Sequence, residues 1–122
     1  MSKLYNIFLD KQLIGTTALE KADARMGVVF GNILFLNIAS GYIFFKDYCS
    51  KNKIQFDDFP NVKLISTQDI RNLKIFDSLG VEIKGSASSI SGMDSEGYEI
   101  TIEGIPYPFY QKEFPHHVKI AR

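Results

Sequence analysis

A nearly uninterrupted apolar stretch, residues 26–38, constrains the fold of this chain more than any other feature. Its sequence is Met-Gly-Val-Val-Phe-Gly-Asn-Ile-Leu-Phe-Leu-Asn-Ile, in which only Asn32 and Asn37 carry polar side chains. Such a run forms either a strand covered on both faces or part of a buried helix. Its Val-Val and Ile-Leu-Phe-Leu content and its two glycines favour extended chain. It holds no acid, base or nucleophile, which indicates a structural centre.

The size of the chain predicts one domain. It has 122 residues, and a domain of that size buries roughly two-thirds of its unfolded surface without a metal or disulfide. Cys49 is the only cysteine, which fits a reducing compartment. The first ten residues lack the apolar core of a signal peptide, and no apolar run reaches the length of a membrane span. We therefore expect a single domain, residues 1–122, in the cytoplasm.

Alternation of apolar and polar residues predicts a mostly antiparallel sheet. The clearest half-buried strand is 98–103, where apolar residues alternate with Glu99, Thr101 and Glu103. The segment 4–9 is apolar on both faces, so we expect that strand to be well covered. Residues 19–25 are expected to be a charged connection and residues 55–60 a loop. The other segments expected to be extended are 13–18, 62–65, 73–76, 81–84 and 85–91.

One amphipathic helix is predicted after the apolar stretch. Apolar residues recur at spacings of four, three and four from Ile38 to Cys49, which is typical of a helix with one buried face. Ser40 is a suitable N-cap, and Asn52 is expected to close the helix in a left-handed conformation. This is the only long helix that the pattern predicts, and it should lie across one face of the sheet.

The C-terminal segment, residues 105–118, combines prolines with aromatic residues. Its three prolines exclude a central strand, and its four aromatic residues argue against disorder. We expect an ordered wrap over the core with one helical turn from Pro108 to Phe114. The predicted fold class is α+β: a mostly antiparallel sheet with one principal amphipathic helix packed on it and an ordered proline and aromatic C-terminal wrap.

The sequence offers few groups for catalysis or metal binding. His116 and His117 are the only histidines, and neighbours in an extended chain point to opposite sides, which disfavours a shared metal. Cys49 lies in the apolar stripe of the helix, where a thiol is buried and inert. The glycines at 27 and 31 do not form a phosphate-binding loop. We therefore predict no catalytic residues, metal or cofactor.

Charge distribution provides the remaining functional signal. Fourteen basic residues balance fourteen acidic ones, which argues against a nucleic-acid-binding protein. No basic residue lies between Lys84 and Lys112, although four acidic residues do. This acidic segment is either a solvated sheet face or a docking surface for a cationic protein, which nearby acids and interface-prone tyrosines would complete. The candidate partner-binding residues are Asp57, Asp58, Asp94, Glu96, Glu99, Glu103, Tyr107 and Tyr110.

Six stretches at the two ends of the chain are distinctive when they are read together: Asn6-Ile7-Phe8-Leu9-Asp10, Leu13-Ile14-Gly15, Ala18-Leu19-Glu20, Met26-Gly27-Val28-Val29-Phe30-Gly31, Gly104-Ile105-Pro106-Tyr107-Pro108 and Phe114-Pro115-His116-His117. In these stretches the chain resembles a group of small uncharacterised bacterial proteins. Some proteins of this size and style are immunity proteins of polymorphic toxins, including contact-dependent growth inhibition systems. The resemblance implies a cytoplasmic antidote that binds one cognate toxin domain, occludes its active site and performs no chemistry. Nuclease toxins tend to be basic, which would give the acidic strand a role.

Two other functions stay open at this point. The first is a small enzyme or ligand-binding protein that uses the C-terminal aromatic residues with His116 or His117. A deep pocket lined by Tyr107, Tyr110 and a histidine would favour it. The second is a structural subunit that pairs through an exposed sheet edge.

Overall fold

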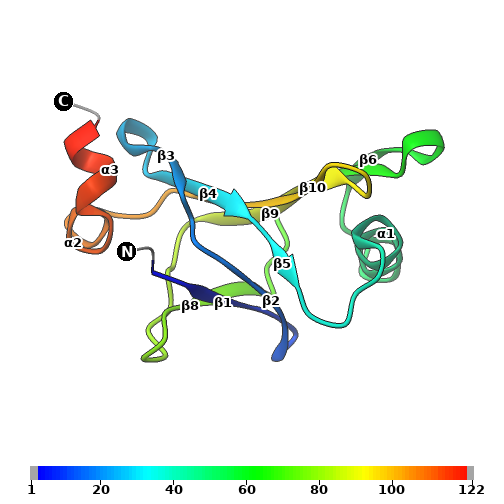
Figure 1. Ribbon diagram of the computed structural model, residues 1–122, viewed down its shortest axis with the longest axis horizontal. Coiled ribbons are helices and arrows are strands. Elements are labelled where there is room, and N and C mark those ends of the chain that lie inside the picture. The colour runs from blue at the N-terminus through cyan, green and yellow to red at the C-terminus, as the bar shows by residue number, and fades with distance from the viewer. Residues whose placement is uncertain (1–2, 121–122) are drawn as a thin grey trace.

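The chain folds into two antiparallel sheets that face each other, with helices at both ends (Figure 1). The computed structural model describes residues 3–120, with side chains to Val118. The strand order is β5-β2-β1-β8 in the smaller sheet and β3-β4-β10-β9-β7-β6 in the larger. The expected α+β class is confirmed, although the strands divide between two sheets.

The strands are β1 (Tyr5–Leu9), β2 (Gln12–Thr17), β3 (Lys21–Asp23), β4 (Val28–Asn32), β5 (Leu34–Phe35), β6 (Phe56–Phe59), β7 (Leu64–Thr67), β8 (Leu73–Phe76), β9 (Ala87–Met93) and β10 (Gly97–Glu103). The helices are η1 (Ala24–Met26), α1 (Gly41–Lys51), η2 (Pro60–Val62), α2 (Phe109–Glu113) and α3 (Pro115–Ile120).

The apolar stretch 26–38 connects the two sheets. Its first part is β4 of the six-stranded sheet and its second part is β5, at the edge of the four-stranded sheet. A Cβ on Gly31 would lie 2.6 Å from Thr17 Oγ1, so glycine allows the close approach at this crossing. Extended chain is confirmed, but cover on both faces is wrong. Leu34 is 72% exposed because no second layer lies over the outer side of either sheet.

The core lies between the two inner faces. Alternation along each strand places one set of side chains inward and the next outward. On β10 the inward residues Ile100 and Ile102 are fully buried, as are Ile7 of β1 and Ile75 of β8. The same alternation leaves an outer face on each sheet. The expected cover on both sides of residues 4–9 is therefore wrong, since Leu4 is 59% exposed and Phe8 half-buried.

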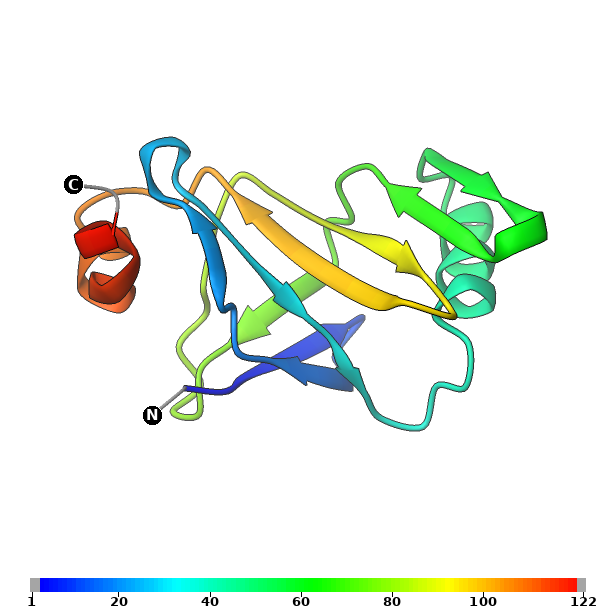
Figure 2. The same cartoon turned by 45° about the horizontal axis from the view of Figure 1, so that its top comes forward.

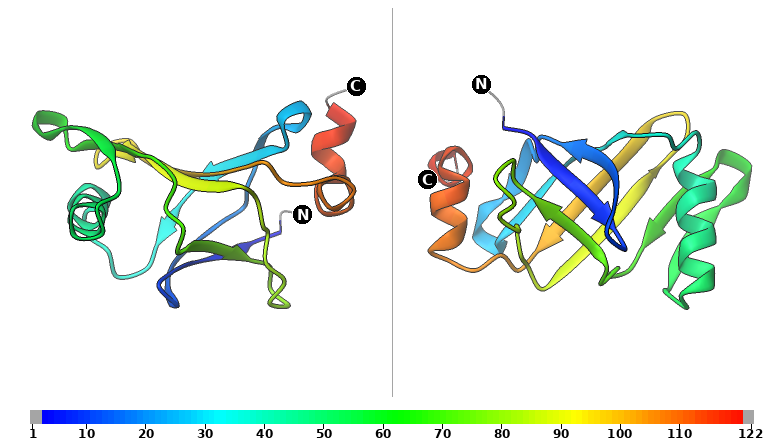
Figure 3. Two further views of the ribbon diagram at one scale, coloured as in Figure 1. Left: turned by 180° about the vertical axis from the view of Figure 1, so that it is seen from behind. Right: turned by 90° about the horizontal axis from the view of Figure 1, so that it is seen from below.

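Helix α1 covers one end of the six-stranded sheet, next to β7 and β9 and beside the smaller sheet (Figure 3). Ser40 is the N-cap as expected, since its Oγ accepts a hydrogen bond from Ile43 N at 3.1 Å. At the other end the left-handed residue is Lys53, with φ of 58°, and not Asn52. Ile54 N donates to Cys49 O at 2.9 Å, which places the left-handed position one residue after the C-cap.

The C-terminal segment packs against the opposite end of the molecule from α1 (Figure 1). It is ordered as expected: α2 lies within the helical turn expected from Pro108 to Phe114, and a second short helix, α3, follows it. Tyr110, Phe114 and His117 are buried, and α3 contacts β3. Aromatic residues therefore fix this segment to the sheet.

Three local predictions are wrong. Residues 56–59 form strand β6 where a loop was expected, because β7 offers them a free edge to pair with. The expected charged connection 19–25 contains β3 and η1, since Lys21 to Asp23 pair with β4. Residues 81–84 form no strand and make only one bridge, Phe76 to Glu82. Among residues 3–120 no helix is both long and apolar enough to cross a bilayer.

Candidate binding surface

The outer face of the six-stranded sheet is open to solvent. In Figure 2 this face is turned forward, and no helix or loop lies across β4, β10 and β9. On β10 the inward residues Tyr98, Ile100 and Ile102 are at most 4% exposed. Glu99, Thr101 and Glu103 alternate with them and point to the outer side. The alternation that the sequence showed along residues 98–103 therefore separates a core face from a solvated face.

Strand register extends one row of this outer face across five of the six strands, from β4 to β6. Glu99 lies opposite Asn32 of β4 and opposite Ser91 of β9, and residues directly opposite in antiparallel strands share a face. The same row continues through Ser66 to Asp57 of β6. The residues of this row are polar, and larger apolar residues, among them Phe30 and the exposed Phe59, lie on the same face.

The outer face is acidic. Register places four carboxylates on it, and Lys21 is the only basic residue among the strand positions that share it. Lys21 Nζ forms an ion pair with the Glu99 carboxylate, and a hydrogen bond from this group to Glu99 raises the pKa of Lys21. The remaining carboxylates have no ion-pair partner among the described residues. We call this surface the acidic face, defined by Asp23, Asp57, Glu99 and Glu103.

Asp94 does not belong to the acidic face, because its carboxylate binds the start of α1. Its Oδ2 accepts from Ser40 Oγ at 2.6 Å, and its Oδ1 accepts from Tyr98 OH at 2.7 Å and from Tyr42 N at 3.2 Å. Partial burial alone would raise its pKa, but these hydrogen bonds outweigh it and lower the pKa of Asp94. Asp94 therefore joins the β9–β10 turn to the helix.

Asp58 also faces α1. It alternates with Asp57 on β6, so one carboxylate points outward and the other toward the helix. The Asp58 carboxylate accepts a hydrogen bond from Tyr42 OH and lies 3.1 Å from Lys46 Nζ. The bonds from Tyr42 and Lys46 lower the pKa of Asp58. Glu96 is exposed in the β9–β10 turn, at the border of the acidic face.

The two predicted tyrosines lie at the other end of the molecule. Tyr110 is fully buried and its hydroxyl donates to Val28 O at 2.9 Å, and burial raises its pKa to about 12. Tyr107 stacks on it with ring centroids 5.2 Å apart and donates to Ala24 O at 2.9 Å. Tyr107 is 47% exposed, so only this tyrosine presents its ring to solvent.

The histidines and the cysteine take structural positions. His117 is buried with Nε2 2.9 Å from Leu19 O, while His116 is exposed, as expected of one packed and one solvated residue. They lie in α3 and not in extended chain, so their rings are 4.0 Å apart. Burial raises the pKa of Cys49 to about 11. Among the described residues no group of three or more His, Cys, Asp or Glu is arranged to hold a metal.

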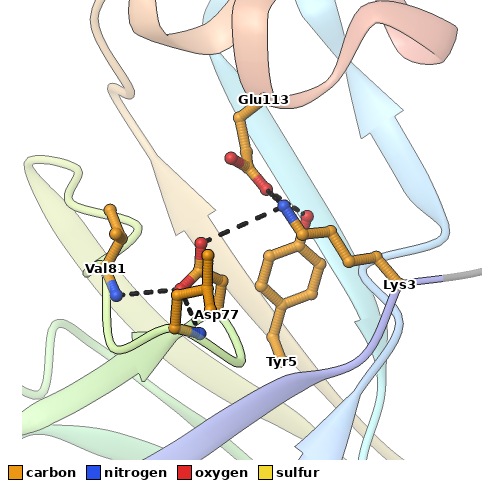
Figure 4. A network of polar contacts seen from close by, with 6 residues as sticks. Lys3, Tyr5, Asp77, Val81 and Glu113 are labelled. Carbon is orange, nitrogen blue, oxygen red and sulfur yellow. Dashed lines mark hydrogen bonds and ion pairs between the residues drawn. The ribbon is translucent and has the colours of Figure 1, made fainter.

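A polar network that the sequence did not predict joins both ends of the chain (Figure 4). Glu113 of α2 accepts from Tyr5 OH at 2.7 Å and from Lys3 Nζ at 2.6 Å. Lys3 Nζ also lies 4.0 Å from Asp77, whose Oδ1 accepts from the backbone N of Leu79 and Val81. Burial, followed by the bond to Glu113, raises the pKa of Tyr5. Tyr5 therefore stays a hydrogen-bond donor, and the network attaches α2 to β1.

The structure thus divides the eight predicted residues among three places. The outer face holds Asp57, Glu99 and Glu103, with Glu96 at its border. The interface with α1 holds Asp58 and Asp94, and the C-terminal end holds Tyr107 and Tyr110. In comparisons with protein-family models, with curated proteins and with solved structures, nothing matches this chain.

Proposed function

We propose that this protein is a non-enzymatic binding protein, an immunity protein that docks on a cognate toxin domain and occludes its active site. The observation that carries the proposal is the acidic face: an uncovered sheet surface whose strand positions hold four carboxylates and one basic residue. The partner is a protein with a basic surface, as nuclease toxins have. The proposal places the complex in the cytoplasm and requires no cofactor.

The electrostatics of the acidic face support this role. Asp57 and Glu103 are exposed and have no ion-pair partner among the described residues, so each contributes a full charge to the field above the sheet. Such a field accelerates encounter with a cationic partner and orients it. The short side chains of Ser66 and Ser91, in the row between Glu99 and Asp57, leave backbone and carboxylates accessible.

The helix N-terminus at Asp94 and the C-terminal aromatic cluster contribute in a different way. Asp94 and Asp58 hold α1 against the sheet, and Tyr110 holds the C-terminal segment. These residues stabilise the six-stranded sheet, on which the acidic face lies, without being part of that face. We therefore limit the proposed docking surface to Asp23, Asp57, Glu96, Glu99 and Glu103, with Tyr107 outside its centre.

The test is co-expression with the toxin domain encoded by the adjacent upstream gene. The wild-type protein should restore growth and should form a complex that can be purified. The double variant Asp57→Lys/Glu103→Lys should associate about tenfold or more slowly at low salt, with a flatter dependence on ionic strength. Asp47→Lys is the control for a charge reversal away from this face, and it is compared with Asp57→Lys alone, because each replaces one exposed carboxylate by an ammonium group.

The two ways in which this test can fail are distinguishable. If the adjacent domain is harmless or does not bind, the immunity function is wrong. If the complex forms but the double variant associates at the wild-type rate, the function stands and the acidic face is not the docking surface.

A further inference from the structure

A groove lies on the outer face of the other sheet, on the side opposite to the acidic face. Figure 3 shows this sheet from below, with β1 and β8 uncovered in front. The groove follows these two strands and has a volume of about 820 Å³, which is within the range of sites for small organic molecules. The residues that carry the argument are Asn6, Phe8, Lys11, Asn72, Lys74 and Phe76, and we call this site the aromatic groove.

The floor of the aromatic groove is a block of four side chains. Register pairs Phe8 with Lys74 and Asn6 with Phe76, so these four residues share one face. The two aromatic rings occupy one diagonal, with centroids 5.5 Å apart and planes at 87°. The other diagonal holds an amide and an ammonium group. An apolar floor with a few polar groups beside it is the usual composition of a ligand site.

The groove carries two lysines and two carboxylates, so its formal charge is balanced, and its preference for an anion rests on which of these groups is free to bind. The two carboxylates already accept hydrogen bonds within the chain. Asp77 accepts two backbone hydrogen bonds from its own turn, and Asp10 binds Tyr48, whose pKa is raised by burial and then by this bond. Lys11 and Lys74 are exposed and form no ion pair among the described residues. The groove therefore offers two ammonium groups next to its aromatic floor.

The backbone at Lys11 adopts a conformation that is unfavourable for lysine. Asp10 and Lys11 form the two-residue turn between β1 and β2 with φ of 51° and 69°. Such turns favour Asn-Gly or Asp-Gly, because glycine adopts positive φ without strain. Lysine adopts positive φ with more strain than glycine does. Its side chain places a positive charge at the end of the groove.

We propose that the aromatic groove binds a small aromatic anion, a flat ring system with one carboxylate or phosphate group. The ring contacts Phe8 and Phe76, while the anionic group lies between Lys11 and Lys74. The amides of Asn6 and Asn72 are available to hydrogen-bond substituents on the ring. This site is separate from the acidic face and does not depend on the immunity function.

The test uses three probes with the same ring system: 2-naphthoate, 2-naphthyl phosphate and the uncharged 2-naphthol. Binding is followed by calorimetry and by the amide chemical shifts of ¹⁵N-labelled protein. We expect both anions to shift the amides around Phe8 and Lys74 and to bind about tenfold more tightly than 2-naphthol. The tighter of the two anions identifies the carboxylate or the phosphate class.

Variants separate the contribution of the charges from that of the rings. Lys11→Gln/Lys74→Gln should weaken both anions about tenfold and leave 2-naphthol unchanged, whereas Phe76→Ser should weaken all three probes. Lys84→Gln, which removes an exposed lysine outside the groove, is the control. Phe8→Ser repeats the ring test if Phe76→Ser loses the dispersed spectrum of the folded protein.

Three results would overturn the proposal. The first is the absence of shifts at the groove at millimolar probe concentration, and the second is equal binding of charged and uncharged probes. The third is a dimer by light scattering that Phe76→Ser converts to monomer, because a second copy would then cover the groove.

Discussion

The two outer faces of this molecule follow the same geometry and differ in chemistry. Both lie on antiparallel strands whose inward residues form one shared core. The larger sheet presents four carboxylates among serine and threonine, with Phe30 and the exposed Phe59 on the same side, whereas the smaller presents Phe8, Phe76 and exposed leucines. Strand alternation therefore determines which residues face outward, and residue choice determines what each face can bind. We propose that one face binds a cationic protein and that the other binds a small aromatic anion.

The largest effect is expected from the core beneath both faces. Ile7 and Ile100 are fully buried, one under each outer face. Ile7→Ala and Ile100→Ala should each lower the free energy of unfolding by about 2–5 kcal/mol, because each leaves a cavity in the shared core. Urea denaturation followed by circular dichroism measures this. Two separate unfolding transitions in either variant would show that the two sheets unfold independently. The two outer faces would then not share one core.

A pH-dependent effect should separate Asp94 from the acidic face. Its folded pKa is lowered, so the stabilisation is present above the pKa of the unfolded chain and is lost as pH falls through the folded pKa. Asp94→Asn should therefore be less stable than wild type at neutral pH, and the difference should shrink in acid. Thermal unfolding from neutral to acidic pH measures it. If the difference in stability between wild type and Asp94→Asn did not change with pH, the ionised carboxylate would not have the role assigned to it.

The smallest effect is expected on the acidic face itself. Asp57 and Glu103 are exposed and make no ion pair among the described residues. Asp57→Asn and Glu103→Gln should each change the free energy of unfolding by less than about 0.5 kcal/mol. The same denaturation experiment checks this. A loss above about 1 kcal/mol would mean that these residues serve the fold, and association data on their variants would need a correction for stability.

Local pattern was sufficient for the most regular elements, and it was insufficient for β3, for β6 and for the pairing of the strands. Spacing along residues 38–49 predicted α1 and its Ser40 cap, and alternation predicted β10 with its outward acids. Covering layers depend on contacts between distant segments, so the apolar residues Phe8 and Leu34 were wrongly expected to be covered. Packing between the two sheets buries one side of each strand. No further helix or strand of the described chain covers the outer side of these strands.

The same limit applied to the candidate site. Glu99 and Asp57 lie in one row only because β9 and β7 are placed between their strands, and no spacing in the sequence contains that order. The Tyr5–Glu113 contact spans 108 positions. Its only local signal was a tyrosine on a buried strand face, whose hydroxyl needs a partner. Tyr110 was placed among interface residues by type, although its hydroxyl binds Val28 O inside the fold.

The central claim is that the partner binds the outer face of the six-stranded sheet. It is tested most directly by titrating the ¹⁵N-labelled protein with the toxin domain that the proposal assigns to the adjacent gene, and by mapping the perturbed amides. The account predicts changes concentrated at Asp57, Ser91, Glu99 and Glu103, with β1 and β8 unaffected. Changes confined to the aromatic groove or to the C-terminal helices, with the acidic face unperturbed, would contradict it.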